Sequence, residues 1–177
     1  FRSVYTGTRA DHKRALCDED MKKVFTRLPS SSAIPLAVRR AQDMFVLMFL
    51  LRGLPFVDLA YLRKSDLRDK VITYRRRKTG RPLSVTLTPE ALELLKKYMN
   101  RDSHSPYLFS LLKSGEGTKE AYREYQLALR SFNQQLTLLG EVLGLNDKLS
   151  SYTARHTWAT TAYYCEIHPG IISEAMG

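Results

Sequence analysis

The sequence predicts one mainly α-helical α+β domain that holds a small antiparallel β-sheet. Apolar residues recur at spacings of three and four over most of the chain, as on the buried face of a helix. The segment 71–87 differs, because β-branched and aromatic residues stand on either side of a turn, which is typical of two paired strands. A chain of 177 residues with 44% hydrophobic residues is long and apolar enough for one such core.

The beginning of the chain predicts a basic linker or arm over residues 1–15. This stretch carries four Lys or Arg residues against one acid and shows little apolar periodicity. It either follows a preceding domain or is a plain disordered terminus. We therefore place the folded domain over residues 16–177.

The helices before the hairpin are expected over 18–28, where three acids complement the helix dipole at the start, and over 38–51, which is apolar and buried. Gly53 closes the second helix, and short helical turns are expected over 58–66.

The helices after the hairpin begin with recognisable signals. Thr88 and Pro89 open the first of them, and a long helix has one apolar face over 125–143. Either Ser150 or Ser151 is expected to cap a helix that runs to Tyr163. Pro169 is expected to open a last helix that ends at Gly177.

Composition favours a nucleic-acid partner. Twenty-eight Lys and Arg against 18 Asp and Glu give a net charge of +10, which attracts polyanions, although an anionic membrane surface would attract the same charge.

The longest apolar run, 44–51, is far shorter than the roughly 20 residues that span a bilayer. The two cysteines, Cys17 and Cys165, lie far apart and fit a reducing cytoplasm. The histidines are scattered, so the sequence predicts no metal site. It has no phosphate-binding glycine loop, so it predicts no nucleotide cofactor.

Three separated cationic sites remain, and each has an ordinary structural interpretation beside the functional one. Arg52 ends an apolar helix, where it either complements the helix dipole or binds an anion. Residues 75–81 place five cations on a turn, either as a solvated loop or as phosphate contacts. Tyr152 and Arg155 share a face near a helix start, either as part of a packed aromatic cluster with His156 or as an anion site.

Together, and in this order, the three sites resemble the catalytic domain of the tyrosine recombinases, the phage-type integrase family. The family pattern has an arginine, a hairpin lysine, an H-x-x-R helix, a G-H pair and a nucleophilic tyrosine. The sequence RHTWAT at 155–160 is the most specific match, residues 78–80 resemble the hairpin lysine motif, and residues 174–177 resemble the end of the helix that leads into G-H. The resemblance covers residues 16–177 and implies the fold of that catalytic domain.

The sequence departs from the family pattern at three places. Pro55 stands where the first arginine follows Gly-Leu, so Arg52 is expected to replace it, an arrangement similar to integrases of Bacteroides-type mobile elements. Tyr152 replaces the H-x-x-R histidine, which keeps a hydrogen-bond donor but loses an imidazole that titrates near neutral pH. The sequence ends at Gly177, before the G-H histidine and the nucleophilic tyrosine, so we expect this fragment to be inactive alone.

The resemblance implies a site-specific DNA recombinase or integrase that cuts and rejoins DNA strands through a 3′-phosphotyrosyl intermediate, without metal or cofactor. It implies a cytoplasmic enzyme that acts on double-stranded DNA as a homo-oligomer. The implied catalytic residues are Arg52, Lys78, Tyr152 and Arg155, and the implied DNA contacts are Arg75, Arg76, Arg77, Arg81 and His156. The alternatives are a non-catalytic DNA-binding or architectural protein of the same fold and a basic RNA-binding module.

Overall fold

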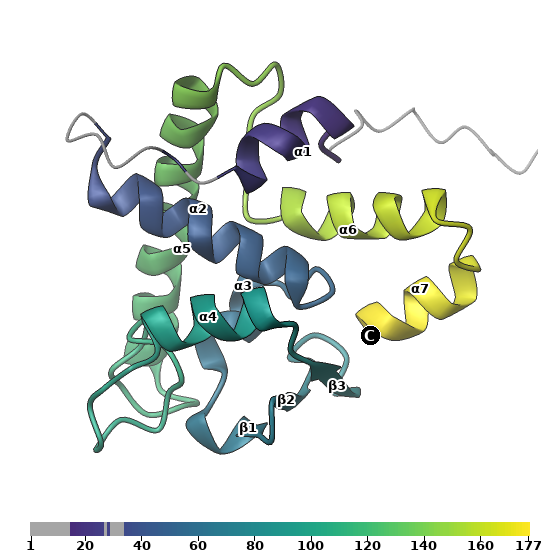
Figure 1. The fold of residues 1–177 in the computed structure, drawn as a ribbon. Coiled ribbons are helices and arrows are strands. Elements are labelled where there is room, and N and C mark those ends of the chain that lie inside the picture. Colours follow the sequence, from purple (N-terminus) through teal and green to yellow (C-terminus); the bar gives the residue numbers. More distant parts are fainter. Residues whose placement is uncertain (1–14, 27, 29–33) are drawn as a thin grey trace, which may run out of the picture.

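The computed structural model describes residues 15–26, 28 and 34–177, so the predicted arm lies outside the described residues except for Ala15. Helices make up most of the domain, and a small three-stranded antiparallel sheet lies along one side of them, which confirms the predicted fold class (Figure 1). In chain order the elements are α1 (Asp18–Phe25), α2 (Leu36–Leu50), α3 (Phe56–Tyr61), a 3₁₀ turn (Lys64–Asp66), β1 (Leu67–Arg68), β2 (Val71–Arg75), β3 (Pro82–Thr86), α4 (Pro89–Tyr98), α5 (Lys119–Leu143), α6 (Thr153–Tyr164) and α7 (Pro169–Met176).

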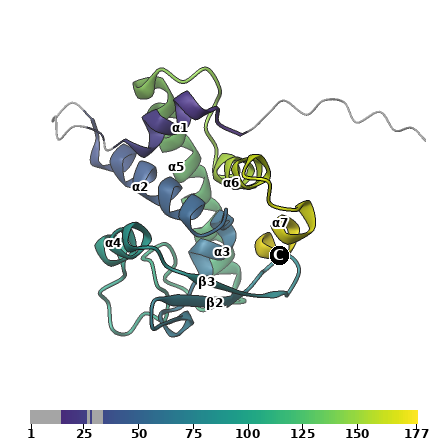
Figure 2. The ribbon, with the colours of Figure 1, turned by 45° about the vertical axis from the view of Figure 1, so that its right-hand side comes forward.

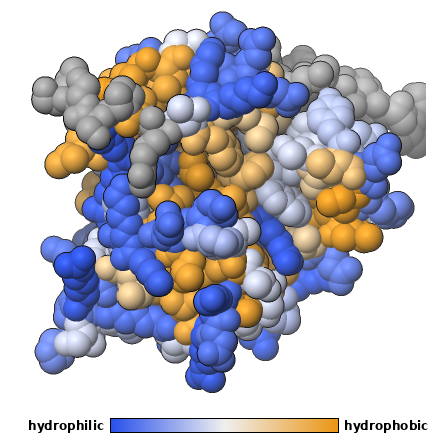
Figure 3. Space-filling model, in the orientation of Figure 1, coloured by the Kyte–Doolittle hydropathy of each residue, from blue (hydrophilic) through white to orange (hydrophobic). Residues whose placement is uncertain are grey.

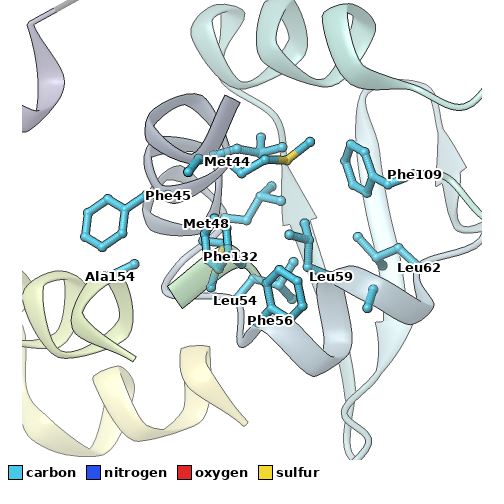
Figure 4. Packing of buried hydrophobic residues seen from close by; sticks show 14 of the residues in the cluster. Met44, Phe45, Met48, Leu54, Phe56, Leu59, Leu62, Phe109, Phe132 and Ala154 are labelled. Atoms are coloured by element: carbon cyan, nitrogen blue, oxygen red, sulfur yellow. The ribbon is translucent and has the colours of Figure 1, made fainter. Parts of the chain in front are cut away.

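Helix α2 is the centre of the domain and contacts α1, α4, α5 and α6. Its buried residues lie on several sides of the helix, as expected of a helix that is covered by neighbours all round. Figure 4 shows Phe45 and Met48 of α2 in this core, together with Phe56 of α3 and Phe132 of α5. The last two rings stack with centroids 4.8 Å apart, which joins α3 to α5.

The sheet has the order β1-β2-β3, and the predicted hairpin is confirmed with Ile72 opposite Val85. Both side chains are buried, so this face of the sheet points into the core. Because side chains alternate along a strand, Tyr74 belongs to the same inward face, and Arg76 follows it just beyond the end of β2. Pro82 is tolerated because β3 is an edge strand.

Helix α6 is fixed by two buried contacts. Ala154 is fully buried and lies toward Phe45 of α2 (Figure 4). The hydroxyl of Thr157 donates to the Thr153 carbonyl and accepts from the Leu16 N–H, which ties the helix to the start of the described domain. The neighbouring residue Arg155 is therefore held in a defined position.

The surface changes character between the sheet and α7. In Figure 3, hydrophilic side chains cover much of the lower part of the molecule, where Figure 1 places the sheet, and apolar atoms gather toward the right, in the region of α7. The large exposed apolar residues of α6, α7 and the turn between them are Tyr163, Tyr164, Ile167 and Ile171. Among the helices that the structure describes, none combines the length and apolar character that crossing a membrane requires.

Some helix boundaries differ from the predictions. Helix α1 ends at Phe25, because Thr26 adopts an extended backbone. Neither serine caps α6: its N-cap is Tyr152, which has a helical backbone and makes no side-chain cap. The Ser150 N–H instead donates to the Thr153 hydroxyl, so the chain enters the helix through a tight turn that satisfies this donor. Strand β1 has only two residues, too few for a recognisable alternation.

Candidate functional site

The predicted cationic sites lie where four segments meet: the turn after α2, the β2–β3 turn, the start of α6 and the end of α7. Figures 1 and 2 both show the end of α7 beside the sheet. A Cβ placed on Gly177 would lie 2.8 Å from Leu83 Cδ1, so the end of α7 touches β3 directly. This junction joins residues that are more than a hundred positions apart in the sequence.

The turn after α2 brings the chain close to α6. Arg52 and Gly53 have φ angles of 58° and 68°, in the left-handed region, and they end α2. A Cβ on Gly53 would lie 2.9 Å from Arg155 Cα, closer than real Cβ atoms come to backbone. Glycine is needed here both for its backbone angle and for the space that it leaves to α6.

The guanidinium of Arg155 spans two backbone segments. Its Nη1 donates to the Gly53 carbonyl at 3.1 Å, and its Nη2 donates to the Met176 carbonyl at 3.1 Å. Burial lowers the pKa of Arg155 below its ordinary value, and the neighbouring charge of Arg76 lowers it further. Arg155 is thus a partly desolvated cation at the junction.

Arg76 and Asp58 form a buried ion pair beside Arg155. Arg76 Nε donates to Asp58 Oδ2 at 2.9 Å, and the Arg77 N–H donates to Asp58 Oδ1 at 2.9 Å. The two residues are only 6% and 2% exposed, so each charge depends on its partner. Burial raises the pKa of the Asp58 carboxyl, and the Arg77 N–H and the Arg76 charge counteract that rise.

Two guanidiniums converge on a single oxygen atom. The carbonyl oxygen of Met176 accepts from Arg76 Nη1 at 2.7 Å and from Arg155 Nη2 at 3.1 Å. This carbonyl belongs to the last turn of α7, where backbone acceptors lack partners within the helix and the helix dipole is negative. The junction therefore contains a point at which one oxygen binds two arginines.

Arg52 lies on the neighbouring side of the junction. It lines an open pocket of about 480 Å³ with Arg81, Glu174 and residues 82–84. Arg52, Arg76 and Arg155 each act to lower the pKa of the Tyr74 phenol, whereas burial and then Asp58 raise it, and the net shift is upward. The three guanidiniums therefore lie within electrostatic range of one half-buried ring, which remains a neutral hydrogen-bond donor at ordinary pH.

The hairpin turn buries Arg76 and leaves the other four predicted cations exposed. The Arg76 N–H donates to the Arg81 carbonyl and the Gly80 N–H donates to the Arg76 carbonyl, and Lys78 is exposed between them. Three exposed arginines have partners of their own: Arg75 donates to the Gly80 carbonyl, Arg81 pairs with Glu174, and Arg77 pairs with Glu116.

Glu116 holds two cations near the hairpin. It accepts hydrogen bonds from Arg63 and Arg77, and these bonds lower the pKa of its carboxyl. The guanidinium carbon of Arg77 also lies 3.7 Å from the centroid of the Tyr61 ring, a cation–π contact. Arg77 is thus ordered beside the turn, with part of its charge compensated.

Tyr152 lies at the start of α6 and is 48% exposed. Its ring contacts the ring of His156 edge to face, with centroids 4.9 Å apart. Tyr152 acts to raise the pKa of Arg155, so its phenol is within electrostatic range of that guanidinium. Tyr152 and Arg155 are therefore neighbours at the start of α6, and the Tyr152 side chain is about half exposed.

The structure thus brings Arg52 and Arg155 to one junction, with Tyr152 beside them, and places Lys78 at the exposed tip of the adjacent turn. Sequence reasoning grouped Arg76 with its neighbours as a DNA contact, but its side chain is buried and bound to Asp58. It did not foresee Asp58 as the acid that holds the hairpin. The strand alternation of Ile72 and Tyr74 was the signal that Arg76 points inward.

Within residues 15–26, 28 and 34–177, no three His, Cys, Asp or Glu side chains gather as a metal-ion site would require.

A family model described as the phage integrase family matches residues 15–177. The chain belongs to this family. No curated protein sequence gave a match.

Several solved structures of recombinases and integrases share the fold. The crystal structure of XerA recombinase has a TM-score of 0.62 at 20% identity, over 92% of this chain and 55% of that one. A lambda integrase dimer bound to a COC′ core site has a TM-score of 0.57 at 19% identity, over 96% and 57%. The lambda integrase catalytic core has a TM-score of 0.55 at 17% identity, over 92% and 90%. The chain thus spans about half of the longer structures and nearly all of the isolated catalytic core.

The contact between Gly53 and Arg155 predicts an unequal effect of two alanine substitutions. Gly80 has a similar left-handed φ of 71°, but nothing lies within 4 Å of an added Cβ. Gly80→Ala is expected to cost about 1–2 kcal/mol of unfolding free energy from backbone strain alone. Gly53→Ala is expected to cost about 2–5 kcal/mol, because the clash with α6 adds to the strain. Urea unfolding measures both, and equal losses would contradict the close packing of α6 on this turn.

Proposed function

We propose that this chain forms the catalytic domain of a tyrosine-type site-specific recombinase, which cuts and rejoins DNA strands. The observation that carries the proposal is the junction itself. Arginines from the turn after α2, from the hairpin and from α6 lie within electrostatic range of the Tyr74 ring, and those of the hairpin and α6 bind one oxygen atom. An exposed lysine stands on the same hairpin. Clustered guanidiniums suit a phosphodiester, because they provide paired donors to its non-bridging oxygens. Membership of the phage integrase family supports the same reaction.

In the proposed reaction, a tyrosine oxygen attacks the phosphorus of a DNA phosphodiester and the bond to the 5′-oxygen breaks. The products are a 3′-phosphotyrosyl link and a 5′-hydroxyl. Attack by the 5′-hydroxyl of a second strand reverses the step and releases the tyrosine, so no external energy source is needed. Negative charge grows on the non-bridging oxygens during both steps, and Arg155 is placed to stabilise it.

The leaving 5′-oxygen needs a proton, and Lys78 is the proposed donor. Its ammonium stands on a flexible side chain at the tip of the turn, next to the arginines but outside their buried network. Tyr152 is proposed to donate its hydroxyl to the phosphate rather than to attack it, because it occupies the position of the histidine in the family motif.

Double-stranded DNA is the proposed partner, bound as a homo-oligomer in the cytoplasm. The net charge of +10 supports a polyanionic ligand. Two structures of the same fold are described as a XerH site-specific recombinase bound to its difH substrate and a lambda integrase dimer bound to a core site. The exposed Arg75, Arg77 and Arg81, together with His156, are proposed to contact the DNA near the hairpin and the start of α6.

The intact protein should form a covalent adduct with a nicked suicide duplex that carries its recombination site, detected by denaturing gel electrophoresis. Arg155→Ala should abolish the adduct, because one arginine in a phosphoryl-transfer site contributes about 10³–10⁵ in rate. Duplex binding, measured by fluorescence anisotropy, should be largely kept, since many other cations contribute to it. An adduct yield equal to wild type would defeat the role of Arg155, and the absence of any adduct with the unmodified protein would favour an architectural DNA-binding protein.

Lys78→Ala should slow cleavage of ordinary DNA, because the leaving 5′-oxygen lacks its proton donor. A substrate with sulfur in place of the bridging 5′-oxygen has a better leaving group and should restore the rate. The comparison of cleavage rates on the two substrates measures this. If the sulfur substrate gives no rescue, Lys78 positions the DNA and does not supply the proton.

Glu116→Gln should strengthen duplex binding, because it releases two cations, Arg63 and Arg77, from their shared carboxylate. The plot of log affinity against log salt should become steeper by about 0.9 for each phosphate newly neutralised. Glu141→Gln is the matched control, since it removes the same charge at the opposite end of the 25-residue α5. An equal gain in affinity for both variants would show a general charge effect instead.

A further inference from the structure

The order of residues in the sequence does not identify the arginine that acts together with Arg155 on the phosphate. Pro55 occupies the position of the family's first arginine, and Arg52 is the nearest replacement in the sequence. The structure offers another candidate, because Arg76 from the hairpin has its guanidinium next to that of Arg155. The partner of Arg155 should bind the same atom as Arg155 does, and this criterion separates Arg52 from Arg76.

Arg76 meets this criterion directly. Its Nη1 and the Nη2 of Arg155 donate to the same oxygen, the Met176 carbonyl, at 2.7 and 3.1 Å. Arg52 instead lines the open pocket with Arg81 and the outer part of α7. An oxygen at the position of the Met176 carbonyl therefore contacts Arg76 and Arg155 together.

The charges at this point favour an anion over a carbonyl. Two adjacent guanidiniums repel each other, which contributes to the lowered pKa of Arg155. Asp58 compensates only one of the two positive charges, so the group of three side chains retains one net positive charge. A phosphate oxygen carries formal charge and makes stronger hydrogen bonds to guanidinium than a neutral carbonyl does.

Arg76 is also held in the way that such a role requires. Asp58 binds its Nε, and the neighbouring Arg77 N–H binds the same carboxylate. The guanidinium is thereby fixed with Nη1 directed at the end of α7, where it donates to the shared Met176 oxygen and also to the Gly177 carbonyl. A donor that is already oriented needs no reorganisation when charge develops on its acceptor. Arg52 has a less constrained setting at the edge of an open pocket.

We propose that Arg76, and not Arg52, is the partner of Arg155 in binding a non-bridging oxygen of the scissile phosphate. The Met176 carbonyl holds the place of that oxygen in the DNA-free protein, and the last turn of α7 moves aside when DNA binds. This inference rests on the proposed recombinase function. It changes the assignment of Arg76 from a groove contact to a catalytic residue.

The test compares Arg76→Gln, Arg52→Gln and Arg68→Gln in the intact protein. Arg68 is the matched control, because it is an exposed arginine of the same sheet, in the edge strand β1, and is not among the proposed DNA contacts. Each variant is assayed on two suicide duplexes, one with the natural scissile phosphate and one with a neutral methylphosphonate in its place. The methylphosphonate lacks one charged oxygen, so its cleavage depends less on a second guanidinium.

Arg76→Gln should lose about 10³-fold in cleavage rate on the natural phosphate, with most of the loss removed on the methylphosphonate. Arg52→Gln and Arg68→Gln should stay within about tenfold of wild type on both substrates, as expected of cations outside the transition-state contact. A role of Arg76 in folding alone would lower the rate on both substrates equally. That result, or a substrate-dependent rescue of Arg52→Gln instead, would overturn the proposal.

Arg76→Lys guards against a variant that fails to fold. Lysine keeps the charge opposite Asp58, but one ammonium cannot hold the carboxylate and the phosphate oxygen with the fixed geometry of a guanidinium. It should melt close to wild type and show the same preference for the methylphosphonate. A folded Arg76→Lys without that preference would also overturn the proposal, whereas a wild-type protein that forms no adduct would refute the recombinase function itself.

Discussion

The buried ion pair between Asp58 and Arg76 is the constraint on which the rest of the site depends. Both charges are removed from water, and loss of one partner from such a pair typically costs about 3–5 kcal/mol because the other charge is left buried. The carboxylate also accepts the Arg77 N–H, so a single side chain at the start of α3 fixes the whole hairpin turn. The backbone next to Lys78 is therefore held in place, although the Lys78 side chain itself is exposed.

A second constraint acts on the opposite side of the junction. Gly53 allows α6 to approach the turn after α2, and the Gly53 carbonyl then accepts a hydrogen bond from Arg155. The same left-handed turn directs Arg52 toward the pocket beside α7, because two consecutive residues with positive φ reverse the chain at the end of α2. This one turn thus places Arg155 at the junction and directs Arg52 to its neighbouring side.

Local signals in the sequence predicted the helix starts at Thr88 and Pro169 and the hairpin itself, since these depend on residues next to one another. The predicted cap of α6 was wrong because the chain enters the helix through Tyr152 with a helical backbone, and the Thr153 hydroxyl accepts the Ser150 N–H in the turn before it. The meeting of the cationic segments followed only from the family resemblance. The shared oxygen of Met176 could not be predicted, because it joins residues 76, 155 and 176 through packing alone.

The five cations of the hairpin divide into two physical classes. The exposed ones are hydrated, so salt screens their charge, and in the proposed function their number sets the strength of DNA binding. Arg76 is buried and Arg155 is partly desolvated beside it, and Asp58 compensates only one of the two charges, so the two guanidiniums repel each other. An anion that contacts both guanidiniums relieves their repulsion, and the relief grows with the negative charge of the anion. In the proposed reaction, this pair therefore stabilises the transition state more than the ground state, whereas the exposed cations of the same hairpin stabilise both alike.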